Sequence, residues 1–393
     1  MAIVKLAEVC EKIGSGATPR GGKEAYCDEG ISLVRSQNVL DFNFSKEGLA
    51  FINDEQAKKL SNVEVHSGDV LLNITGDSVA RACLMDDDYL PARVNQHVAI
   101  IRGNSHKIMN GYVLYYLQWR KEYLLQLASA GATRNALTKA MIEQLELDLP
   151  PLDSQQQIVA ILDSLQSKIQ LSQKTNDNLY EMVNAYYTSL FKDVECEMTT
   201  IGNYAERIYS GGTPTTSNAA YWGGAFGWFS SGETRNRFVI STEKSITQTG
   251  IDNSSTKLAA KHDIVMASAG QGFTRGQTSM LLIDTYVNQS VIVIHADRKI
   301  LPYLFWNLAN RYEELRAISD SSSIRGSLTT KMIAAFEVPL ANNDVIQTFS
   351  DFAWAVIPQI ENNLLENERL AALRDSLLPK LMSGEIDVSA VQL

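Results

Sequence analysis

Two stretches of this chain share one spacing of apolar residues, and that spacing limits the folds available to it. Apolar side chains recur every three or four positions from Ile158 to Leu190 and again from Phe349 to Leu381. A repeat of about 3.5 residues is typical of a long helix with a coiled-coil seam. We therefore predict two long helices that pack on each other as an antiparallel pair. The alternative for either stretch alone is an amphipathic helix that covers its own domain.

Polar residues interrupt both seams near the middle. They are Ser172 and Asn176 in the first stretch and Asn363 and Asn367 in the second. With antiparallel packing and matched seams, Ser172 would face Asn367 and Asn176 would face Asn363. A buried pair of asparagines penalises shifted registers, because a shift leaves an amide against an apolar side chain without a partner. The alternative is a splayed, hydrated middle section that sets no register.

The segments that precede the two stretches repeat each other. Residues at matched places follow the same order in both segments, which indicates an internal duplication. The matched pairs include Thr18 and Thr213, Tyr26 and Tyr221, Asp69 and Asp263, Gly76 and Gly270, Arg81 and Arg275, Gln96 and Gln289, Arg134 and Arg325, and Leu137 and Leu328.

Each repeat combines short apolar runs with glycine-rich turns, which predicts strands over 30–35, 69–74, 97–102, 227–230, 263–268 and 290–295. One helix is expected near 112–127 and its counterpart near 302–318. Pro150 and Pro151 end the first repeat, and Asp153 or Ser154 is expected to cap the helix that follows. Pro358 is expected to kink the second long helix or to mark its start.

The predicted fold class is mixed α/β (α+β), with two repeated domains and two long helices that form an antiparallel coiled coil. We expect a first domain over 1–152, a helix over 153–195, a second domain over 196–343, and a helix with a C-terminal tail over 344–393. A chain of 393 residues is long enough to give each domain its own core.

Composition excludes several classes of protein. The chain lacks an apolar run of about 18 residues and a hydrophobic leader, so we expect a cytoplasmic protein with no membrane partner. Its four cysteines have no metal-binding spacing, which argues against a zinc site and a disulfide framework. A net charge of −10 argues against nonspecific binding of nucleic acid, but most of that charge falls in 151–195 and 344–393.

Signatures of catalysis are missing from the sequence. It has no GxxxxGK[ST] phosphate loop and no Asn/Asp-Pro-Pro-aromatic tetrapeptide of the kind that suggests base methylation. Three consecutive acids, Asp86 to Asp88, are typical of a solvated loop rather than a metal site. We therefore expect no catalytic residue, and no metal or cofactor bound by this chain.

Polar side chains suited to DNA occur in the loops of both repeats. Arginine, glutamine and asparagine make paired hydrogen bonds with base edges, whereas lysine, threonine and glycine-rich backbone hold phosphates. The alternative for each loop is an ordinary polar surface. The predicted DNA-binding residues are Thr18, Arg20, Arg35, Gln37, Asn38, Asn73, Thr75, Arg81, Gln96, Arg134, Asn135 and Lys139 in the first repeat, and Thr213, Thr215, Thr216, Gln271, Arg275, Gln289, Arg325 and Lys331 in the second.

Three segments resemble the specificity subunits of type I restriction-modification systems. One is Ser-Gly-Gly-Thr-Pro at 210–214 with Tyr-Trp-Gly-Gly at 221–224 and Trp228. Another is Leu-Arg-Asp-Ser-Leu-Leu-Pro-Lys-Leu-Met-Ser-Gly-Glu-Ile at 373–386, and the third is the Leu-Pro-Pro-Leu turn at 149–152. The first repeat departs from this pattern, because 16–20 are Gly-Ala-Thr-Pro-Arg and Cys27 stands in place of a tryptophan.

The resemblance implies a sequence-recognition subunit that is not itself an enzyme. In that family two target recognition domains each bind one half of a bipartite site in double-stranded DNA. Expected partners are two methyltransferase subunits and the restriction subunits, and S-adenosylmethionine, ATP and magnesium would be bound by those partners. The assembled complex would methylate adenine and cut DNA. The alternative is a protein-binding scaffold that touches no DNA, favoured by the negative net charge; an enzyme is the weaker alternative.

Overall fold

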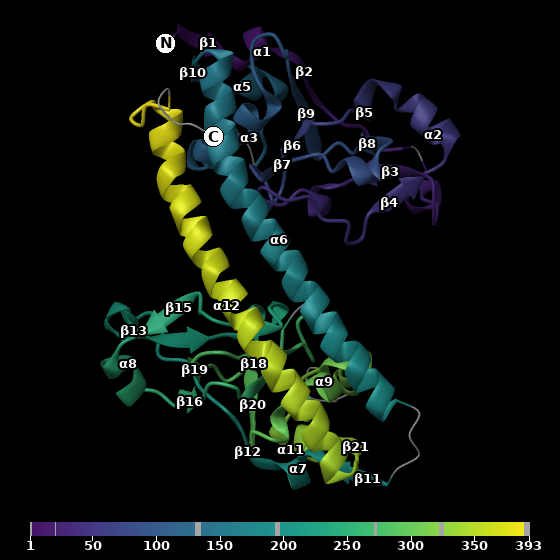
Figure 1. The fold of residues 1–393 in the computed structure, drawn as a ribbon, viewed down its shortest axis with the longest axis vertical. Helices are drawn as coiled ribbons and strands as arrows, with labels where there is room; N and C mark the ends of the chain where they lie inside the picture. The colour runs from purple at the N-terminus through teal and green to yellow at the C-terminus, as the bar shows by residue number, and fades with distance from the viewer. Residues whose placement is uncertain are drawn as a thin grey trace. The chain divides into compact units, whose positions relative to one another are not determined.

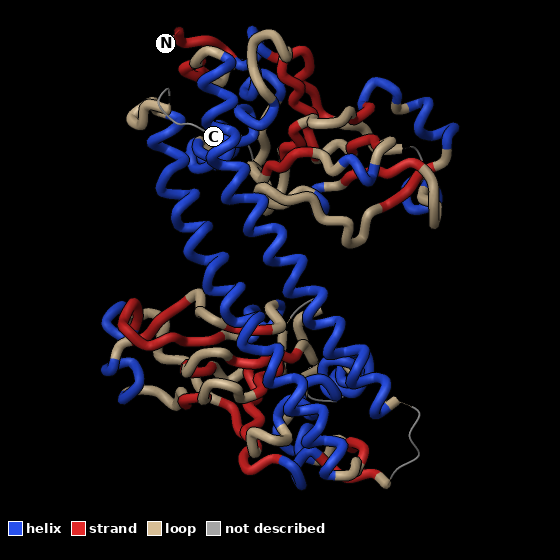
Figure 2. Tube along the Cα trace, viewed as in Figure 1, coloured by secondary structure: helices blue, strands red, loops and turns tan. Residues whose placement is uncertain are grey.

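The computed structural model describes residues 2–19, 21–129, 135–192, 197–270, 273–321 and 326–388. The chain divides into two compact units. The first unit comprises Met1–Ile169 and Arg369–Leu393, and the second comprises Gln170–Glu368. Strands and helices are mixed in both units (Figure 2), which confirms the predicted α/β class.

Two four-stranded sheets form the framework of the first unit. One has the order β2 (Cys10–Ser15), β9 (Val98–Gly103), β6 (Val70–Asn73) and β7 (Ala82–Leu84), with antiparallel neighbours throughout. The other has the order β4 (Ala50–Ile52), β3 (Ile31–Val34), β8 (Ala92–Val94) and β5 (Glu64–Val65), in which β3 and β8 are parallel. A separate antiparallel pair consists of β1 (Ala2–Lys5) and β10 (Glu146–Leu149).

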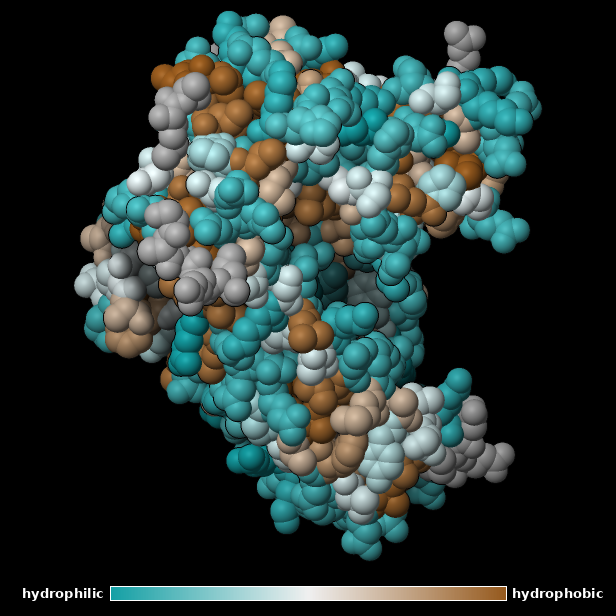
Figure 3. Space-filling model, turned by 45° about the horizontal axis from the view of Figure 1, so that its top comes forward, coloured by the Kyte–Doolittle hydropathy of each residue, from teal (hydrophilic) through white to brown (hydrophobic). Residues whose placement is uncertain are grey.

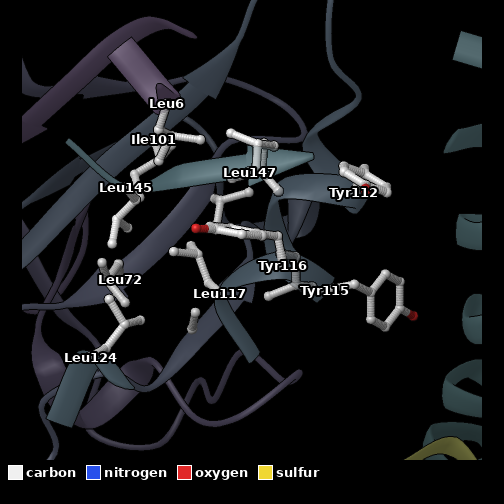
Figure 4. Packing of buried hydrophobic residues seen from close by; sticks show 14 of the residues in the cluster. Leu6, Leu72, Ile101, Tyr112, Tyr115, Tyr116, Leu117, Leu124, Leu145 and Leu147 are labelled. Carbon is white, nitrogen blue, oxygen red and sulfur yellow. The ribbon is translucent and has the colours of Figure 1, made fainter. Parts of the chain in front are cut away.

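Short helices connect these strands and cover the sheets. They are α1 (Leu6–Val9), α2 (Asp54–Lys59), α3 (Asn110–Trp119), α4 (Lys121–Ser129) and α5 (Lys139–Glu143), with 3-10 turns at Gly22–Ala25, Ser36–Asn38, Ser61–Val63 and Asp87–Tyr89. In Figure 4, Tyr116 of α3 lies among buried leucines such as Leu145 and Leu147, whereas Tyr115 points away from them. The Tyr115 hydroxyl donates to Asp163 Oδ1 at 2.6 Å and so ties α3 to the following long helix.

The second unit repeats this topology (Figure 1). Its larger sheet has the order β12 (Ala205–Ser210), β20 (Val291–Ala296), β17 (Ile264–Ala267), β18 (Thr278–Leu281) and β14 (Phe238–Val239). Its other sheet has the order β15 (Lys244–Ile246), β13 (Trp222–Phe229), β19 (Thr285–Val287) and β16 (Lys257–Ala259), and β11 (Met198–Thr200) pairs with β21 (Glu337–Pro339). The short helices are α7 (Ile201–Tyr204), α8 (Gln248–Asp252), α9 (Leu301–Asn310), α10 (Tyr312–Ser321) and α11 (Thr330–Ala334), with 3-10 turns at Ala219–Tyr221 and Ser231–Arg235.

Two helices of 40 residues each, α6 (Leu152–Phe191) and α12 (Asn343–Met382), follow the two repeats, as predicted. In the first unit the start of α6 packs with the end of α12, where Leu162 and Leu378 share one core. In the second unit the end of α6 packs with the start of α12; the Tyr187 and Phe349 rings, for example, lie 5.4 Å apart. The two helices therefore run antiparallel within each unit.

The polar interruption of the seams is partly as predicted. Asn363 Nδ2 donates to Asn176 Oδ1 at 2.7 Å, which confirms that these two residues face each other and that the helices are not splayed there. The Ser172 hydroxyl and both polar atoms of Asn367 are buried without a hydrogen-bond partner among the described residues. Of the four polar residues, only Asn176 and Asn363 are hydrogen-bonded to each other in the described structure, so the polar layer is narrower than predicted.

Some predicted boundaries are wrong. The single helices expected over 112–127 and 302–318 are each broken, at Arg120 and Arg311, although the apolar spacing continues across both breaks. α6 begins at Leu152, so Asp153 lies in its first turn rather than at its cap. α12 runs from Asn343 through Pro358 without interruption. The six predicted strands are present as β3, β6, β9, β13, β17 and β20.

The surface visible in Figure 3 is mostly hydrophilic. Among the helices formed by the described residues, none is both long enough and apolar enough to cross a membrane.

Candidate DNA interface

Several chain segments meet at one end of the β2–β9–β6–β7 sheet in the first unit. Because its neighbouring strands are antiparallel, β2 and β6 end where β9 and β7 begin. The segment after β3 joins them, since Asn95, which follows β8, donates its backbone N–H to Val34 O at 3.0 Å. Leu137 likewise donates to Ile74 O at 2.8 Å. We call the residues gathered here, 16–18, 35–37, 74–76, 81, 95–97 and 135–139, the first loop edge.

The second unit gathers the matched segments in the same way. Asn288 donates its backbone N–H to Phe229 O at 3.1 Å, and Leu328 donates to Ser268 O at 2.9 Å. The second loop edge consists of 211–213, 230–231, 268–270, 275, 288–290 and 326–331. Two matched surfaces of loops therefore result from the duplicated topology.

A threonine and a glutamine form a hydrogen bond across each loop edge. The Thr18 hydroxyl donates to Gln96 Oε1, and the Thr213 hydroxyl donates to Gln289 Oε1. Both glutamines are exposed, so a ligand can reach them. A glutamine held in one orientation presents a donor and an acceptor in a fixed order, which is what paired hydrogen bonding to adenine requires.

Glycine is required where the first strand of each sheet enters the loop edge. A Cβ atom at Gly16 would lie 2.1 Å from Val94 O, and a Cβ atom at Gly211 would lie 1.9 Å from Val287 O. The backbone can approach so closely only without a side chain. The residue after the glycine forms a backbone hydrogen bond at this close contact. Gly212, for example, donates its N–H to Val287 O at 3.1 Å. The approach sets Thr18 and Thr213 beside their glutamines.

Exposed lysines flank both loop edges. Thr138 and Thr329 cap α5 and α11, because their hydroxyl oxygens accept the N–H groups of residues three positions later at 3.2 Å. The caps place Lys139 and Lys331 in the first turn of each helix, where both are exposed. The ion pair of Lys139 with Glu143, at 3.4 Å, lies at the surface and is weak. Both lysines are therefore available for a phosphate.

Arg35 and Gln37 lie at the first loop edge but use part of their hydrogen-bonding capacity within the protein. Both side chains donate to Gly48 O, Gln37 at 3.1 Å. The Arg35 guanidinium also lies over the Tyr26 ring, 5.8 Å from its centroid. Arginine has five N–H donors, so some remain for a ligand.

Asn38 and Asn73 do not belong to a DNA-binding surface, and their prediction was wrong. Both are 0% exposed. Asn38 accepts the Arg35 N–H at 3.0 Å, and Asn73 Nδ2 donates to Ser36 O at 2.8 Å. Their amides satisfy backbone groups of the turn after β3. In the second unit Glu233, which accepts the Ser230 N–H at 2.8 Å, takes the place of Asn38.

Arg275 at the second loop edge also uses part of its hydrogen-bonding capacity within the protein. Its guanidinium donates to Gly326 O and pairs with Asp320 at 2.7 Å, and its side chain is only 17% exposed. These contacts hold the segment that leads into α11. Arg275 therefore helps to position the second loop edge, and its contact with DNA stays a prediction.

The remaining predicted residues stay predictions. Thr75 and Arg81 are half-buried at the first loop edge, and the described residues offer no hydrogen bond to the Arg81 side chain. Asn135, Thr215 and Thr216, which were also predicted to bind DNA, are exposed. Arg20, Arg134, Gln271 and Arg325 lie outside the described residues.

Two further residues were not predicted from the sequence, one at the first loop edge and one beside the second. His97 lies 2.6 Å from the Thr75 hydroxyl through Nδ1 and has no histidine at the matched place of the second repeat. Phe273, between β17 and β18, is 81% exposed, and its carbonyl accepts the Tyr312 hydroxyl at 2.7 Å. An exposed aromatic ring can stack on a base. The available signal was a phenylalanine inside a glycine-rich turn.

Each unit has a buried carboxylate at the start of a central strand, β6 or β17, at the end away from the loop edge. Asp69, before β6, is paired by Arg102 through two contacts of 2.7 Å. Asp263, before β17, instead lies 2.6 Å from His295 Nδ1. Burial raises the pKa of Asp263, and the hydrogen bond from His295 opposes that rise. The two units thus differ in how they hold the same acid.

The described residues were compared with the needs of metal binding and of nucleophilic chemistry. Across the described residues, no group of three histidine, cysteine or acidic side chains is arranged to hold a metal ion. Burial raises the pKa of the Cys10 and Cys83 thiols to about 12, so both stay protonated and are poor nucleophiles at neutral pH. The loop edges present hydrogen-bond donors, hydrogen-bond acceptors and lysine side chains, which are groups suited to binding DNA.

Comparison with known proteins agrees with this arrangement. The family model "Type I restriction modification DNA specificity domain" matches residues 1–181 and 194–367. The type I restriction enzyme HindI specificity subunit of Haemophilus influenzae is 20% identical, with 91% of this chain and 94% of that protein covered. The EcoR124I/EcoR124II specificity subunit of Escherichia coli is 25% identical, with 61% of each chain covered.

A solved structure shares the fold. The crystal structure of the type I restriction-modification system S subunit from M. genitalium has a TM-score of 0.59 and 13% sequence identity, with 97% of this chain and 96% of that chain covered. With a family model that matches both repeats, this chain belongs to the type I restriction-modification specificity family and carries two copies of its DNA specificity domain.

Proposed function

We propose that this chain selects the DNA site of a type I restriction-modification complex, with each loop edge bound to one half of a bipartite site in double-stranded DNA. The observation that carries this proposal is the pair formed by Thr18 and Gln96, which recurs as Thr213 and Gln289 on the exposed end of a matched sheet. A recognition surface that is built twice suits a target with two separate parts.

The distribution of charge is compatible with this role. Most of the net charge of −10 falls in 151–195 and 344–393, which are outside both loop edges. Lys139 and Lys331 stand exposed beside the loop edges, where they would neutralise phosphates. The negative net charge would then act against nonspecific binding without acting against the specific complex.

The chain would supply recognition, and its partners would supply chemistry. Two methyltransferase subunits with S-adenosylmethionine would methylate adenine, and restriction subunits with ATP and magnesium would cut the DNA. α6 and α12 would keep the two recognition surfaces at a set distance. This division of labour rests on the family to which the chain belongs.

Paired substitutions test the proposal. In one variant Thr18 and Gln96 are changed to alanine, and in its matched control Thr213 and Gln289 are changed. We expect each variant, assembled with methyltransferase subunits, to lose discrimination in one half-site only, by about 1–3 kcal/mol per base contact. Competition binding with duplexes that carry one substituted base pair measures this. Normal thermal melting with unchanged discrimination in both half-sites would contradict the proposal.

A protein-binding scaffold that touches no DNA is the second candidate, and the net charge of −10 favours it. The same binding experiment separates the two. A folded complex that shifts no DNA duplex above the level of nonspecific competitor, even at low salt, would support the scaffold.

A further inference from the structure

His97 gives the first loop edge a feature that the second lacks. Its Nδ1 lies 2.6 Å from the Thr75 hydroxyl oxygen, and its Nε2 lies 3.3 Å from Gln96 Nε2. At the matched places the second repeat has Ser290 and Ala269. The glutamine of the first loop edge is therefore joined to a titratable ring, whereas Gln289 is not.

The contacts of His97 determine where its proton lies. An amide nitrogen only donates, so His97 Nε2 accepts from Gln96 and carries no proton. In this arrangement Nδ1 carries the ring proton and donates it to Thr75 Oγ1. Gln96 Oε1 accepts from the Thr18 hydroxyl on its other side. Thr18, Gln96, His97 and Thr75 thus form one directional chain of hydrogen bonds.

A second proton on His97 would reverse part of this chain. Protonated Nε2 is a donor, and two donors cannot share one hydrogen bond. Rotation of the Gln96 amide by half a turn removes the conflict, because Oε1 then accepts from the ring and the NH₂ group donates to the Thr18 oxygen. Gln96 is exposed, so its side chain has room to rotate.

The surroundings leave this exchange to His97 alone. The backbone N–H of His97 donates to Asn95 Oδ1 at 3.0 Å, which fixes the turn that carries the ring. The groups that face the ring, Thr75 from the end of β6 and Gln96 from its own turn, are uncharged. Within the described part of the chain, no carboxylate lies within 4.0 Å of its nitrogens, in contrast to His295.

We propose that His97 is a positioning residue for the first half-site and selects which end of the Gln96 amide faces the DNA. This inference rests on the proposed function. A base edge presents its donors and acceptors in a set order, so exchange of the amide oxygen and nitrogen changes the base that Gln96 fits. The first half-site would then be recognised differently in the two protonation states of His97, and the second half-site would not.

Binding at several pH values tests the proposal with the full chain and its methyltransferase subunits. For the wild-type complex we expect the base preference at one position of the first half-site to change roughly two- to ten-fold between about pH 5.5 and 7.5, the range of one net hydrogen bond. His97→Ser, which introduces the residue of the second repeat, removes that change. The preference in the second half-site stays constant in both proteins.

The matched control is His106→Ser. His106 is exposed and follows β9, at the end of the strand away from the first loop edge, so its substitution should leave the pH profile unchanged. Thr75→Val removes the acceptor of the ring proton but keeps the histidine, and should act like His97→Ser. Thermal melting shows which variants are folded.

A measurement on the wild-type protein needs no substitution. The chain has five histidines, and ¹⁵N chemical shifts of their rings report which nitrogen carries the proton. At about pH 7.5 we expect His97 protonated on Nδ1. Protonation on Nε2, or specific binding with a base preference that ignores pH, would overturn the role of His97. A complex that binds no specific DNA at any pH would instead overturn the proposed function.

Discussion

At the scale of single residues, the loop edges depend on places that only glycine can occupy. The Cβ atom that alanine would add at Gly16 overlaps Val94 O, and the backbone carbonyl cannot move aside without breaking the N–H contacts of Ala17. Gly14, two residues earlier in β2, has open space around the same atom. Gly14 lies within β2 and Gly16 directly follows it, so the two glycines form a matched pair for substitution.

We expect Gly16→Ala to destabilise the protein by about 1–3 kcal/mol and to weaken discrimination in the first half-site. Gly14→Ala should be neutral or slightly stabilising, because alanine lowers the entropy of the unfolded chain. Urea denaturation and competition binding measure both effects. Equal behaviour of the two variants would show that the close approach to Val94 is not needed.

The raised pKa of Asp263 implies that the stability of the protein depends on pH. Because the pKa of Asp263 is raised above its ordinary value of 3.8, the folded state binds that proton more tightly than the unfolded chain does. This contribution to stability is complete below about pH 3.8 and is lost as pH rises through the raised pKa. His295→Arg would supply the permanent cation that Asp69 already has in Arg102.

We therefore expect His295→Arg to reduce this loss of stability as pH rises, by about 1–3 kcal/mol near neutral pH. Chemical denaturation at a series of pH values measures it. The reciprocal change, Arg102→His, should destabilise the first unit at neutral pH. A His295→Arg protein whose stability follows the same pH curve as the wild type would refute the explanation.

Residue chemistry alone did not separate the surface from the interior. Asn38, Asn73 and Arg275 have the donors and acceptors that DNA recognition needs, but the same groups can satisfy buried backbone carbonyls. Which of the two occurs depends on burial, and burial is set by the packing of distant segments. Thr18 and Gln96, in contrast, lie exposed at the first loop edge, and their contact with DNA stays a prediction.

At the scale of elements, the long helices were predictable because their apolar spacing extends over many turns. The pairing of Asn176 with Asn363 followed from the symmetry of the seams. The breaks at Arg120 and Arg311 were not predictable, since each new helix continues the apolar pattern. α6 begins at Leu152, slightly before the predicted cap at Asp153 or Ser154. The side-chain amide of buried Gln155 donates to Pro150 O at 2.9 Å and so fixes the turn before the helix.

Asn367 provides a test of the helix pair. It is 8% exposed, and its amide has no hydrogen-bond partner in the described structure. Asn367→Leu should stabilise the protein by about 1–3 kcal/mol, because it removes an unsatisfied buried polar group. Asn363→Leu should destabilise it, since Asn176 Oδ1 then loses its donor. Guanidinium denaturation compares the two variants, and a lower stability of Asn367→Leu would contradict the interpretation.

The four polar residues at the middle of the seams can also be replaced together. Leucine at Ser172, Asn176, Asn363 and Asn367 together should raise the melting temperature, and should also broaden the range of half-site spacings that the complex accepts. Binding to duplexes with lengthened and shortened spacers measures the second effect. An unchanged spacing preference in a stabilised variant would show that these residues set no register.

The C-terminal part of α12 belongs to the first unit. Leu378, Leu381 and Met382 are buried in one core with Ile158 and Tyr112. Deletion of residues 369–393 should therefore expose amide protons of the first unit to hydrogen exchange and leave those of the second unit protected, since each buried leucine contributes about 1.5–3 kcal/mol. Equal loss of protection in both units would contradict this assignment.

At the scale of the whole molecule, the internal duplication gives both units the same arrangement of strands and loops. The repeat in sequence predicted two matched domains. The structure adds that each unit gathers the matched loops at one end of a single sheet, the one that contains β2 in the first unit and β12 in the second. The compact units differ from the predicted domain boundaries, because α12 returns to complete the core of the first unit. A return of this kind depends on long-range packing and leaves no local pattern in the sequence.

Each loop edge is proposed to bind its own half-site, independently of the other. Exchange of residues 1–150 for the first domain of another family member, followed by sequencing of the methylated positions in a host genome, tests it most directly. We expect one half of the methylated motif to change and the other half to be kept. A motif that changes in both halves, or in neither although methylation persists, would contradict it.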